Sequence, residues 1–249
     1  YAKFGVLSKA QALLEELPVR DVVSWNALIG GYAQHGDSHS VSELCNAMRN
    51  HGLCPDRVVI LCVLKACSVS ANILEGRVIH SEVEKCGLEP DLVLGNALID
   101  MYSKCGSLDD ACTVFENMPT RGVITWSAML AGYAMHNEYD IVLQCFEDMQ
   151  KIGLKPNHVT FLSLLSACGQ KGLIDKAYDY FYSMKAGYGI KPATEHYNCM
   201  IDLLGRAGRV DEAEYLLLTM PYRNKFVSWK SLLSHSKIYR NVQLGRRCF

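Results

Sequence analysis

The sequence carries almost no net charge, because its 25 lysine and arginine residues are matched by 26 aspartate and glutamate residues. Composition therefore does not indicate a polyanionic partner, although a balanced total can still contain a basic stripe. The sequence also has no apolar run approaching the roughly 18 residues of a membrane span, and no cleavable signal segment begins it. We expect no membrane partner.

Motifs of several enzyme classes are missing as well. No two cysteines are spaced as Cys-x-x-Cys, so the zinc signature of nucleobase deaminases is incomplete, and the His-x-Glu match at His80–Glu82 is interpreted as accidental. There is no Gly-rich phosphate loop, no Gly-x-Ser-x-Gly elbow and no His-Glu-x-x-His helix. The sequence predicts no catalytic residue, no metal and no cofactor in this chain.

The eleven cysteines do not indicate a disulfide framework. Their number is odd, and most lie in apolar, helix-like runs such as "LKACS" and "LSACG". The chain is 49% hydrophobic and 20% charged, which is typical of a globular protein. We therefore expect reduced thiols inside a sizeable core.

What the sequence does contain is a long internal repeat. The stretch "VVSWNALIGGYAQHG" at 22–36 returns as "VITWSAMLAGYAMHN" at 123–137, an offset of 101 residues. Because this offset is more than twice the period of known helical repeats, either one very large unit recurs or several smaller units are nested inside it. Turn sequences such as "GLCPD", "GLEPD" and "MPTRG" divide it into units of about 35, 35 and 31 residues. The predicted units are 1–21, 22–56, 57–91, 92–122, 123–157, 158–193, 194–225 and 226–249, the first and last being truncated.

Each unit has the pattern of a helical hairpin. In 22–56, apolar residues recur at helical spacing from Trp25 to Tyr32, Gly36 interrupts them, and the pattern resumes from Val41 to Met48. Prolines after Gly-containing turns prevent continuation of the second helix; they are Pro55, Pro90, Pro156 and Pro192. Asp109, Asp175 and Asp211 place negative charge at the start of second helices. Since an isolated pair of short helices cannot bury its apolar stripe, we predict an all-α fold, a right-handed solenoid of stacked hairpins.

The segments "GNALIDMYSKCGSLDDA" and "HYNCMIDLLGRAGRVDEAEYLL" resemble plant pentatricopeptide repeats of the mixed class, in which P, L and S types alternate. The resemblance assigns 22–56 and 123–157 as P, 57–91 and 158–193 as L, and 92–122 and 194–225 as S. It makes 1–21 a truncated S-type repeat and 226–249 the start of an E extension. The alternative is a protein-binding scaffold of tetratricopeptide type, whose Trp, Leu-Gly and Tyr pattern is not seen.

The resemblance implies single-stranded RNA as the partner, with the fifth and last residues of a repeat selecting one base and the second residue covering it. Asn26 with Asp56 would select uracil beside Val23. Ser127 with Asn157 would select adenine beside Ile124. An amide or hydroxyl at a fixed helix position can match the donors and acceptors of an exposed base edge.

The other repeats fit the family pattern less well. Asn96 and Asn198 are at the fifth place of the S repeats, with Val93 as the covering residue of the first, but their last residues are Gly122 and Lys225. Leu61 and Leu162 take the fifth place of the L repeats, so these units are predicted to act as spacers. Four aromatic residues on the apolar stripe are interpreted as packing; they are Trp25, Trp126, Tyr32 and Tyr133.

The resemblance favours a role in specifying a site of C-to-U editing in mitochondrial or chloroplast RNA. The deaminase, or another editing-factor protein, would then come from further C-terminal sequence or from another chain. The chain begins with Tyr1 in the middle of a repeat pattern, so we interpret it as a piece of a longer protein. A chain that folds as repeats without an RNA target is the third possibility.

Overall fold

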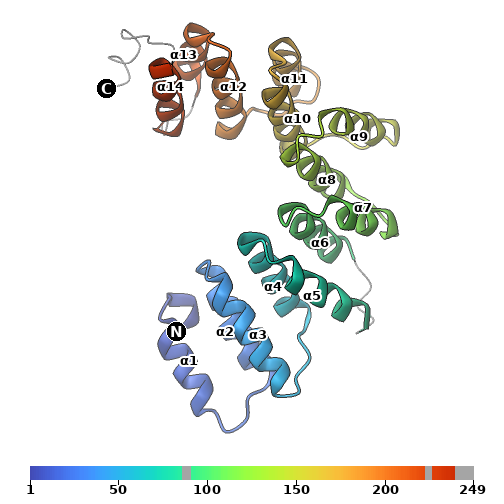
Figure 1. Ribbon diagram of the computed structural model, residues 1–249, viewed down its shortest axis with the longest axis vertical. Helices are drawn as coiled ribbons and strands as arrows, with labels where there is room; N and C mark the ends of the chain where they lie inside the picture. The colour runs from blue at the N-terminus through green and yellow to red at the C-terminus, as the bar shows by residue number, and fades with distance from the viewer. Residues whose placement is uncertain (86–90, 222–225, 239–249) are drawn as a thin grey trace. The chain divides into compact units, whose positions relative to one another are not determined.

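The computed structural model describes residues 1–85, 91–221 and 226–238 (Figure 1). Within these ranges every regular element is a helix. The helices are η1 (Ala2–Phe4), α1 (Leu7–Glu16), α2 (Val22–Gln34), α3 (Ser38–Asn50), α4 (Arg57–Ser70), α5 (Ile73–Lys85), α6 (Leu92–Lys104), α7 (Leu108–Asn117), α8 (Val123–Met135), α9 (Tyr139–Lys151), α10 (His158–Lys171), α11 (Ile174–Ala186), α12 (Thr194–Arg206), α13 (Val210–Thr219) and α14 (Phe226–Ile238). The chain divides into two compact units, Tyr1–Arg121 and Gly122–Phe249.

The hairpin of α2 and α3 shows why each unit folds as it does. Asp21 caps α2 by accepting the Ser24 N–H at 2.9 Å, which satisfies one of the free donors of the first turn. Gly36 adopts a left-handed conformation with φ of 79° and reverses the chain, as the interrupted periodicity predicts. Asp37 then caps α3. The apolar stripes of both helices are buried; they include Trp25, Leu28, Ile29, Tyr32, Val41, Cys45 and Met48.

The hairpins stack within each unit. In the first unit the first helices of successive hairpins, α2, α4 and α6, contact one another in order, and α3 and α5 each contact the first helix that follows. In the second unit α8, α10, α12 and α14 contact one another in the same way. Side chains such as Ile29, Leu98 and Leu130 are fully buried, and each contributes about 1.5–3 kcal/mol relative to an exposed position. The predicted all-α stack of hairpins is confirmed.

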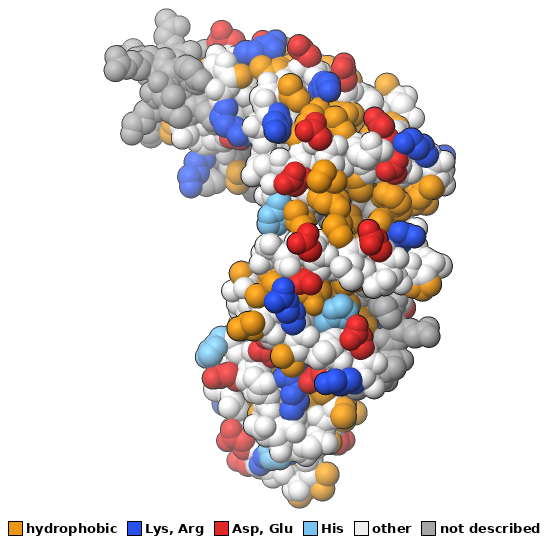
Figure 2. All heavy atoms as spheres, turned by 45° about the vertical axis from the view of Figure 1, so that its right-hand side comes forward, with side chains coloured by type: hydrophobic (Ala, Val, Ile, Leu, Met, Phe, Trp, Pro, Cys, Tyr) orange, Lys and Arg blue, Asp and Glu red, His pale blue; other side chains and the backbone are white. Residues whose placement is uncertain are grey.

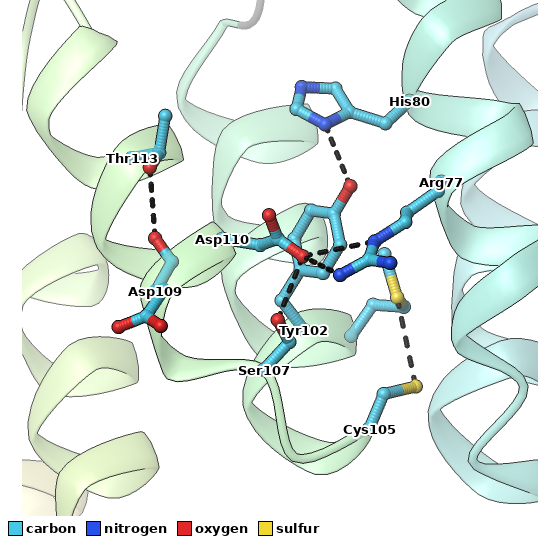
Figure 3. Close-up of polar contacts among 9 residues, drawn as sticks. Arg77, His80, Tyr102, Cys105, Ser107, Asp109, Asp110 and Thr113 are labelled. Atoms are coloured by element: carbon cyan, nitrogen blue, oxygen red, sulfur yellow. Dashed lines mark hydrogen bonds and ion pairs between the residues drawn. The ribbon is translucent and has the colours of Figure 1, made fainter.

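Polar contacts also join the second helices of neighbouring hairpins. Arg77 of α5 donates to Oδ2 of Asp110 in α7 from Nε at 3.1 Å and from Nη2 at 2.8 Å (Figure 3). Ser107 donates to the same oxygen at 2.8 Å, and these bonds, that of Arg77 first, hold the pKa of the Asp110 carboxyl below its usual range. Because the pair is largely solvent-exposed, this contact between α5 and α7 adds little stability.

The His-x-Glu match at 80–82 has structural partners. His80 Nδ1 lies 2.9 Å from the Tyr102 hydroxyl (Figure 3), and Glu82 forms an ion pair with Arg49 of α3 at 2.9 Å. Both contacts join α5 to a neighbouring hairpin. Among the described residues, no group of three or more His, Cys, Asp and Glu side chains is arranged to hold a metal ion.

The prolines and the acidic residues have the positions relative to the helices that the sequence predicts. Pro55 and Pro156 lie between left-handed Gly52 or Gly153 and the cap of the following helix, so the second helix ends before each of them. Pro90 is outside the described residues. The first turns of α7, α11 and α13 carry the predicted carboxylates Asp109, Asp175 and Asp211.

The nine described cysteines are all free thiols. Burial raises the pKa of Cys45 to about 11, of Cys67 to about 12 and of Cys168 to about 11, so these thiols stay protonated and packed in the core. Cys54 differs, since it is exposed. None of the helices in the described ranges is both long and apolar enough to cross a membrane.

Candidate nucleic-acid interface

The last residue of a repeat is the N-cap of the next first helix. Asp56 Oδ1 accepts the N–H groups of Val58 at 2.9 Å and Val59 at 3.1 Å, and Asn157 Oδ1 accepts that of Thr160 at 3.0 Å. Asp21 and Asp91 cap α2 and α6 in the same way. The family resemblance did not reveal this role, although an Asp or Asn directly before an apolar helical run is a recognised start signal. Where the closing residue is Asp or Asn, capping fixes one side-chain oxygen and leaves the second polar atom for other contacts.

In the repeat 22–56 the two predicted selectors are in direct contact. Nδ2 of Asn26, in the second turn of α2, lies 2.5 Å from Oδ2 of Asp56. The carboxylate can only accept, so the amide must turn its NH₂ group toward it. Asn26 Oδ1 is buried and has no hydrogen-bond partner in the part of the chain that the structure describes. The pair therefore offers one free amide N–H of Asn26 and the remaining acceptor capacity of Asp56, while the buried Asn26 Oδ1 is not accessible.

In the repeat 123–157 the contact involves a third residue. Ser127 Oγ donates to Asn157 Oδ1 at 3.1 Å and lies 2.8 Å from Thr160 Oγ1. Ser127 is only 2% exposed and Thr160 is fully buried, whereas Asn157 is half-buried. The serine hydroxyl therefore faces the packing between α8 and α10, and Asn157 supplies the accessible polar group of the pair.

The two repeats predicted to be S-type, 92–122 and 194–225, depart from this pattern. Asn198 Oδ1 accepts a hydrogen bond from Ser228 of α14 at 2.5 Å, while its predicted partner Lys225 lies outside the described residues. Asn96 Oδ1 is buried without a hydrogen-bond partner among the described residues. Gly122 has no side chain to offer it.

In the two repeats predicted to be L-type, 57–91 and 158–193, the fifth place is apolar, as the sequence shows. Leu61 and Leu162 are half-buried. Asp91 closes the repeat 57–91. Because the fifth residue, Leu61, cannot form a hydrogen bond through its side chain, Asp91 instead forms an ion pair with Arg57. The pKa of Asp91 is lowered, first by the Leu94 N–H that it accepts and then by Arg57.

The second residue of nearly every first helix is an exposed aliphatic side chain. In the first unit Val23 is 72% exposed, Val58 54% and Val93 53%; in the second unit Ile124 is 67% exposed, Val159 46% and Val227 63%. The exception is Glu195 in α12. The sequence analysis did not assign Val58, Val159 and Val227 as covering residues, because it assigned them only in P-type and S-type repeats. All three are the second residue of a first helix, so the same register identifies them. Exposed β-branched residues in the same register of stacked helices form an apolar row in each unit.

The aromatic residues of the first helices lie elsewhere. Trp25 and Tyr32 are buried, which agrees with the packing interpretation, and Trp126 and Tyr133 are half-buried. The Tyr32 hydroxyl donates to Gln11 of α1 at 3.0 Å. These rings stabilise the stack, and the candidate interface consists of the polar selectors and the aliphatic row.

Family models match this hairpin array along the chain. The model described as PPR repeat family matches residues 20–69 and 121–170, two windows separated by the same 101 residues as the internal repeat. Models described as PPR repeat match 96–123, 159–187 and 188–221. The chain belongs to the pentatricopeptide repeat family. This assignment decides between the two helical-repeat families that the sequence left open.

Curated pentatricopeptide repeat proteins of Arabidopsis thaliana are similar over the full chain. The putative pentatricopeptide repeat-containing protein At3g11460, named as mitochondrial, is 39% identical over 249 residues, which are 100% of this chain and 40% of that protein. The pentatricopeptide repeat-containing protein At4g16470 is 40% identical over 98% of this chain and 49% of its own length. The chain thus spans about two-fifths to one-half of these pentatricopeptide repeat relatives.

Solved structures share the pentatricopeptide repeat fold. The protein PPR10 in complex with an 18-nt psaJ RNA element matches all of this chain and 38% of its own with a TM-score of 0.81 at 21% identity. PPR10 from maize matches with a TM-score of 0.75. At this identity the likeness establishes the fold alone.

Proposed function

We propose that the chain binds single-stranded RNA in organelle RNA processing, with about one base for each P-type or S-type repeat. One observation carries the proposal. The fifth side chain of a P repeat is hydrogen-bonded to the closing residue, and an exposed aliphatic side chain stands three places before it. Such a site can cover the face of an unstacked base with apolar atoms and match its edge with polar ones.

The polar groups of the first P repeat suit uracil. The Watson–Crick edge of uracil presents an N3–H donor between two carbonyl acceptors. Asp56 supplies acceptor capacity for the N3–H, and the free Nδ2–H of Asn26 supplies a donor for a carbonyl. The pair therefore complements uracil without moving the capping oxygen of Asp56.

The polar groups of the second P repeat suit a base with an acceptor at the centre of its edge. Oδ1 of Asn157 is occupied by the cap and by Ser127, so its Nδ2 group points the two donors away from the helix end. Adenine N1 and cytosine N3 are such acceptors, while guanine N1 and uracil N3 carry hydrogens. Adenine at this repeat is the assignment that the family resemblance favours.

Charge contributes little to this proposal. Figure 2 shows lysine and arginine side chains interspersed with aspartate and glutamate over the face drawn. Two cations of the first helices, Lys104 and Arg206, are paired with acids one turn earlier in their own helices, at 2.7 Å each. Base contacts must therefore supply much of the affinity, and we expect a weaker salt dependence than for a basic RNA-binding protein.

The wider biological role is also proposed. Several curated relatives are named as mitochondrial, which supports an organelle as the location, with the chloroplast as the other candidate. We propose that the bound RNA contains a site of C-to-U editing. A deaminase from further sequence of the same protein, or from another chain, would act there, because the repeats offer only binding groups.

Selection from a random-sequence RNA pool tests the proposal. We expect the chain to enrich RNAs with a uracil preference and an adenine preference at two fixed positions, and we expect the double variant N26A/N157A to lose both. The control V19A changes an exposed residue outside the candidate interface and should leave the selected motif intact. Equal recovery of all sequences, or equal retention of double-stranded DNA, would refute base reading.

A further inference from the structure

Resting on this RNA-binding function, the geometry points to Thr160 as a third, positioning residue for base selection by the Ser127–Asn157 pair. Thr160 is the third residue of α10 and belongs to the next repeat, so a scheme limited to the fifth and last residues omits it. Its hydroxyl lies within hydrogen-bond distance of both selectors.

The hydrogen bonds close into a ring. The backbone N–H of Asn157 donates to Thr160 Oγ1 at 3.1 Å, and this donor has no alternative direction. Thr160 Oγ1 and Ser127 Oγ lie 2.8 Å apart and either can be the donor, and each hydroxyl also lies 3.1 Å from Asn157 Oδ1 and can donate to it. The Thr160 N–H adds a second bond to the same oxygen at 3.0 Å. In either arrangement one hydroxyl donates to Asn157 Oδ1 and the other donates within the Ser127–Thr160 pair, so both protons are used inside the ring and the three side chains hold one another in place.

The ring leaves one polar group for a ligand. Ser127 has used its proton and is buried, and Asn157 Oδ1 accepts from both neighbours. The Nδ2 group of Asn157 retains its two donors. In this repeat Asn157 reads the base, and Ser127 and Thr160 position it.

The same register recurs in other hairpins. Ser228, the third residue of α14, is also a buried hydroxyl and donates to the fifth-place Asn198 at 2.5 Å. In α4 the third residue is Val59, which has no hydroxyl, and there Asn26 bonds directly to Asp56. Thr160 and Ser228 thus contact the fifth residue of the preceding repeat through a hydroxyl, whereas Thr125 at the same place accepts the Gly122 N–H and Asn96 Oδ1 has no partner among the described residues.

A conservative variant series isolates the role of the hydroxyl. T160V removes it with little change of volume, and T160S keeps it. T125V is the matched control, because buried Thr125 accepts the Gly122 N–H at 3.3 Å and so caps α8 as Thr160 caps α10, but it is not bonded to Ser127 or Asn157. Each full chain is tested by competition between RNAs that differ only at the nucleotide assigned to the repeat 123–157 by selection.

We expect the unaltered chain to prefer adenine and cytosine over guanine and uracil at that nucleotide. T160V should lower this preference about fivefold, the worth of one neutral hydrogen bond. T160S and T125V should retain it. The preference is the ratio of the affinities for RNAs that differ at this one nucleotide. A general loss of stability in T160V would lower the affinity for all four RNAs and leave this ratio unchanged.

The outcomes separate the two claims. If T160V keeps the full preference, Thr160 has no part in selection and the inference is wrong, while RNA reading by Asn157 stands. If T125V loses the preference at this nucleotide as strongly as T160V does, helix capping alone explains the effect and the inference is again overturned. If the unaltered chain shows no base preference, the proposed function itself fails.

Discussion

The Nε2 atom of His196 donates to the backbone carbonyl of His158 at 2.9 Å, which joins α12 to the first residue of α10. The other ring nitrogen, Nδ1, accepts the Ala193 N–H at 3.1 Å, so the buried imidazole is neutral and its tautomer is fixed. His196 replaces the threonine that caps α8 and α10 at the same third place. Burial is the main cause that lowers the pKa of His196 below its ordinary value of 6.5.

Stability should therefore fall as the solution is acidified through pH 6.5. Below this value the unfolded chain protonates His196 while the folded chain does not, so protons bind the unfolded state more strongly. The contribution of the neutral His196 to the free energy of unfolding is fully present above pH 6.5. It decreases as the pH falls from 6.5 to the lowered pKa of His196 in the folded chain. Urea unfolding at pH 7.5 and 5.5 measures the loss, and H196T, which keeps a capping acceptor, should reduce it. The neighbouring titratable groups His158 and Glu195 stay unchanged in both proteins, so an identical pH profile of H196T would show that His196 is not the group responsible.

D56N should change the base preferred by the first P repeat. Only the amide oxygen can accept the Val58 and Val59 N–H groups, so the NH₂ group of the introduced amide would face Asn26 and the acceptor for uracil N3–H would be lost. We expect uracil to lose roughly five- to tenfold in relative affinity and cytosine to gain, measured by competition. D91N is the control, because Asp91 also caps a helix but its repeat has Leu61 at the fifth place. A uracil preference unchanged by D56N would contradict the assignment.

I124A should weaken RNA binding without weakening the fold. Ile124 is 67% exposed, so its removal should alter the free energy of unfolding by less than about 0.5 kcal/mol. We expect roughly three- to tenfold weaker binding, since an aliphatic contact covers less of a base than aromatic stacking worth about 1–3 kcal/mol. Ile152, which is 58% exposed at the end of α9, provides the control I152A. Equal effects of the two variants on affinity would remove the aliphatic row from the interface.

L98A should destabilise the first unit strongly. Leu98 of α6 is fully buried, so the deletion leaves a cavity and costs about 2–5 kcal/mol in the free energy of unfolding. L92A, six residues earlier in the same helix, removes a side chain that is partly exposed and should cost below about 1 kcal/mol. Chemical denaturation of both variants measures the difference. Similar costs would mean that α6 does not pack as described.

The fold could be predicted because its signals are local. The run from Trp25 to Tyr32, the break at Gly36 and the restart at Val41 specify a hairpin without reference to any other unit, and the period of the repeats specifies the stacking. The candidate site was predictable only in part. The contact of Asn26 with Asp56 follows from the family register, but the burial of Ser127 and the contact of Asn198 with Ser228 depend on how neighbouring first helices are placed in space. The spacing of residues along the sequence does not specify how closely neighbouring first helices approach at these side chains.

Under the proposed function, one chemical requirement limits how a repeat can change the base that it selects. The side chain that closes a repeat caps the next helix as well as contributing to base selection. Few residue types accept a backbone N–H well at an N-cap. A change of the closing residue that alters base selection is therefore limited to a few short polar residue types, such as the Asp at position 56 and the Asn at position 157. Gly122 and Ala193 are not among these residues: under the proposed function, the repeat that Gly122 closes keeps only Asn96 as a selector, and the repeat that Ala193 closes, with Leu162 at its fifth place, keeps none.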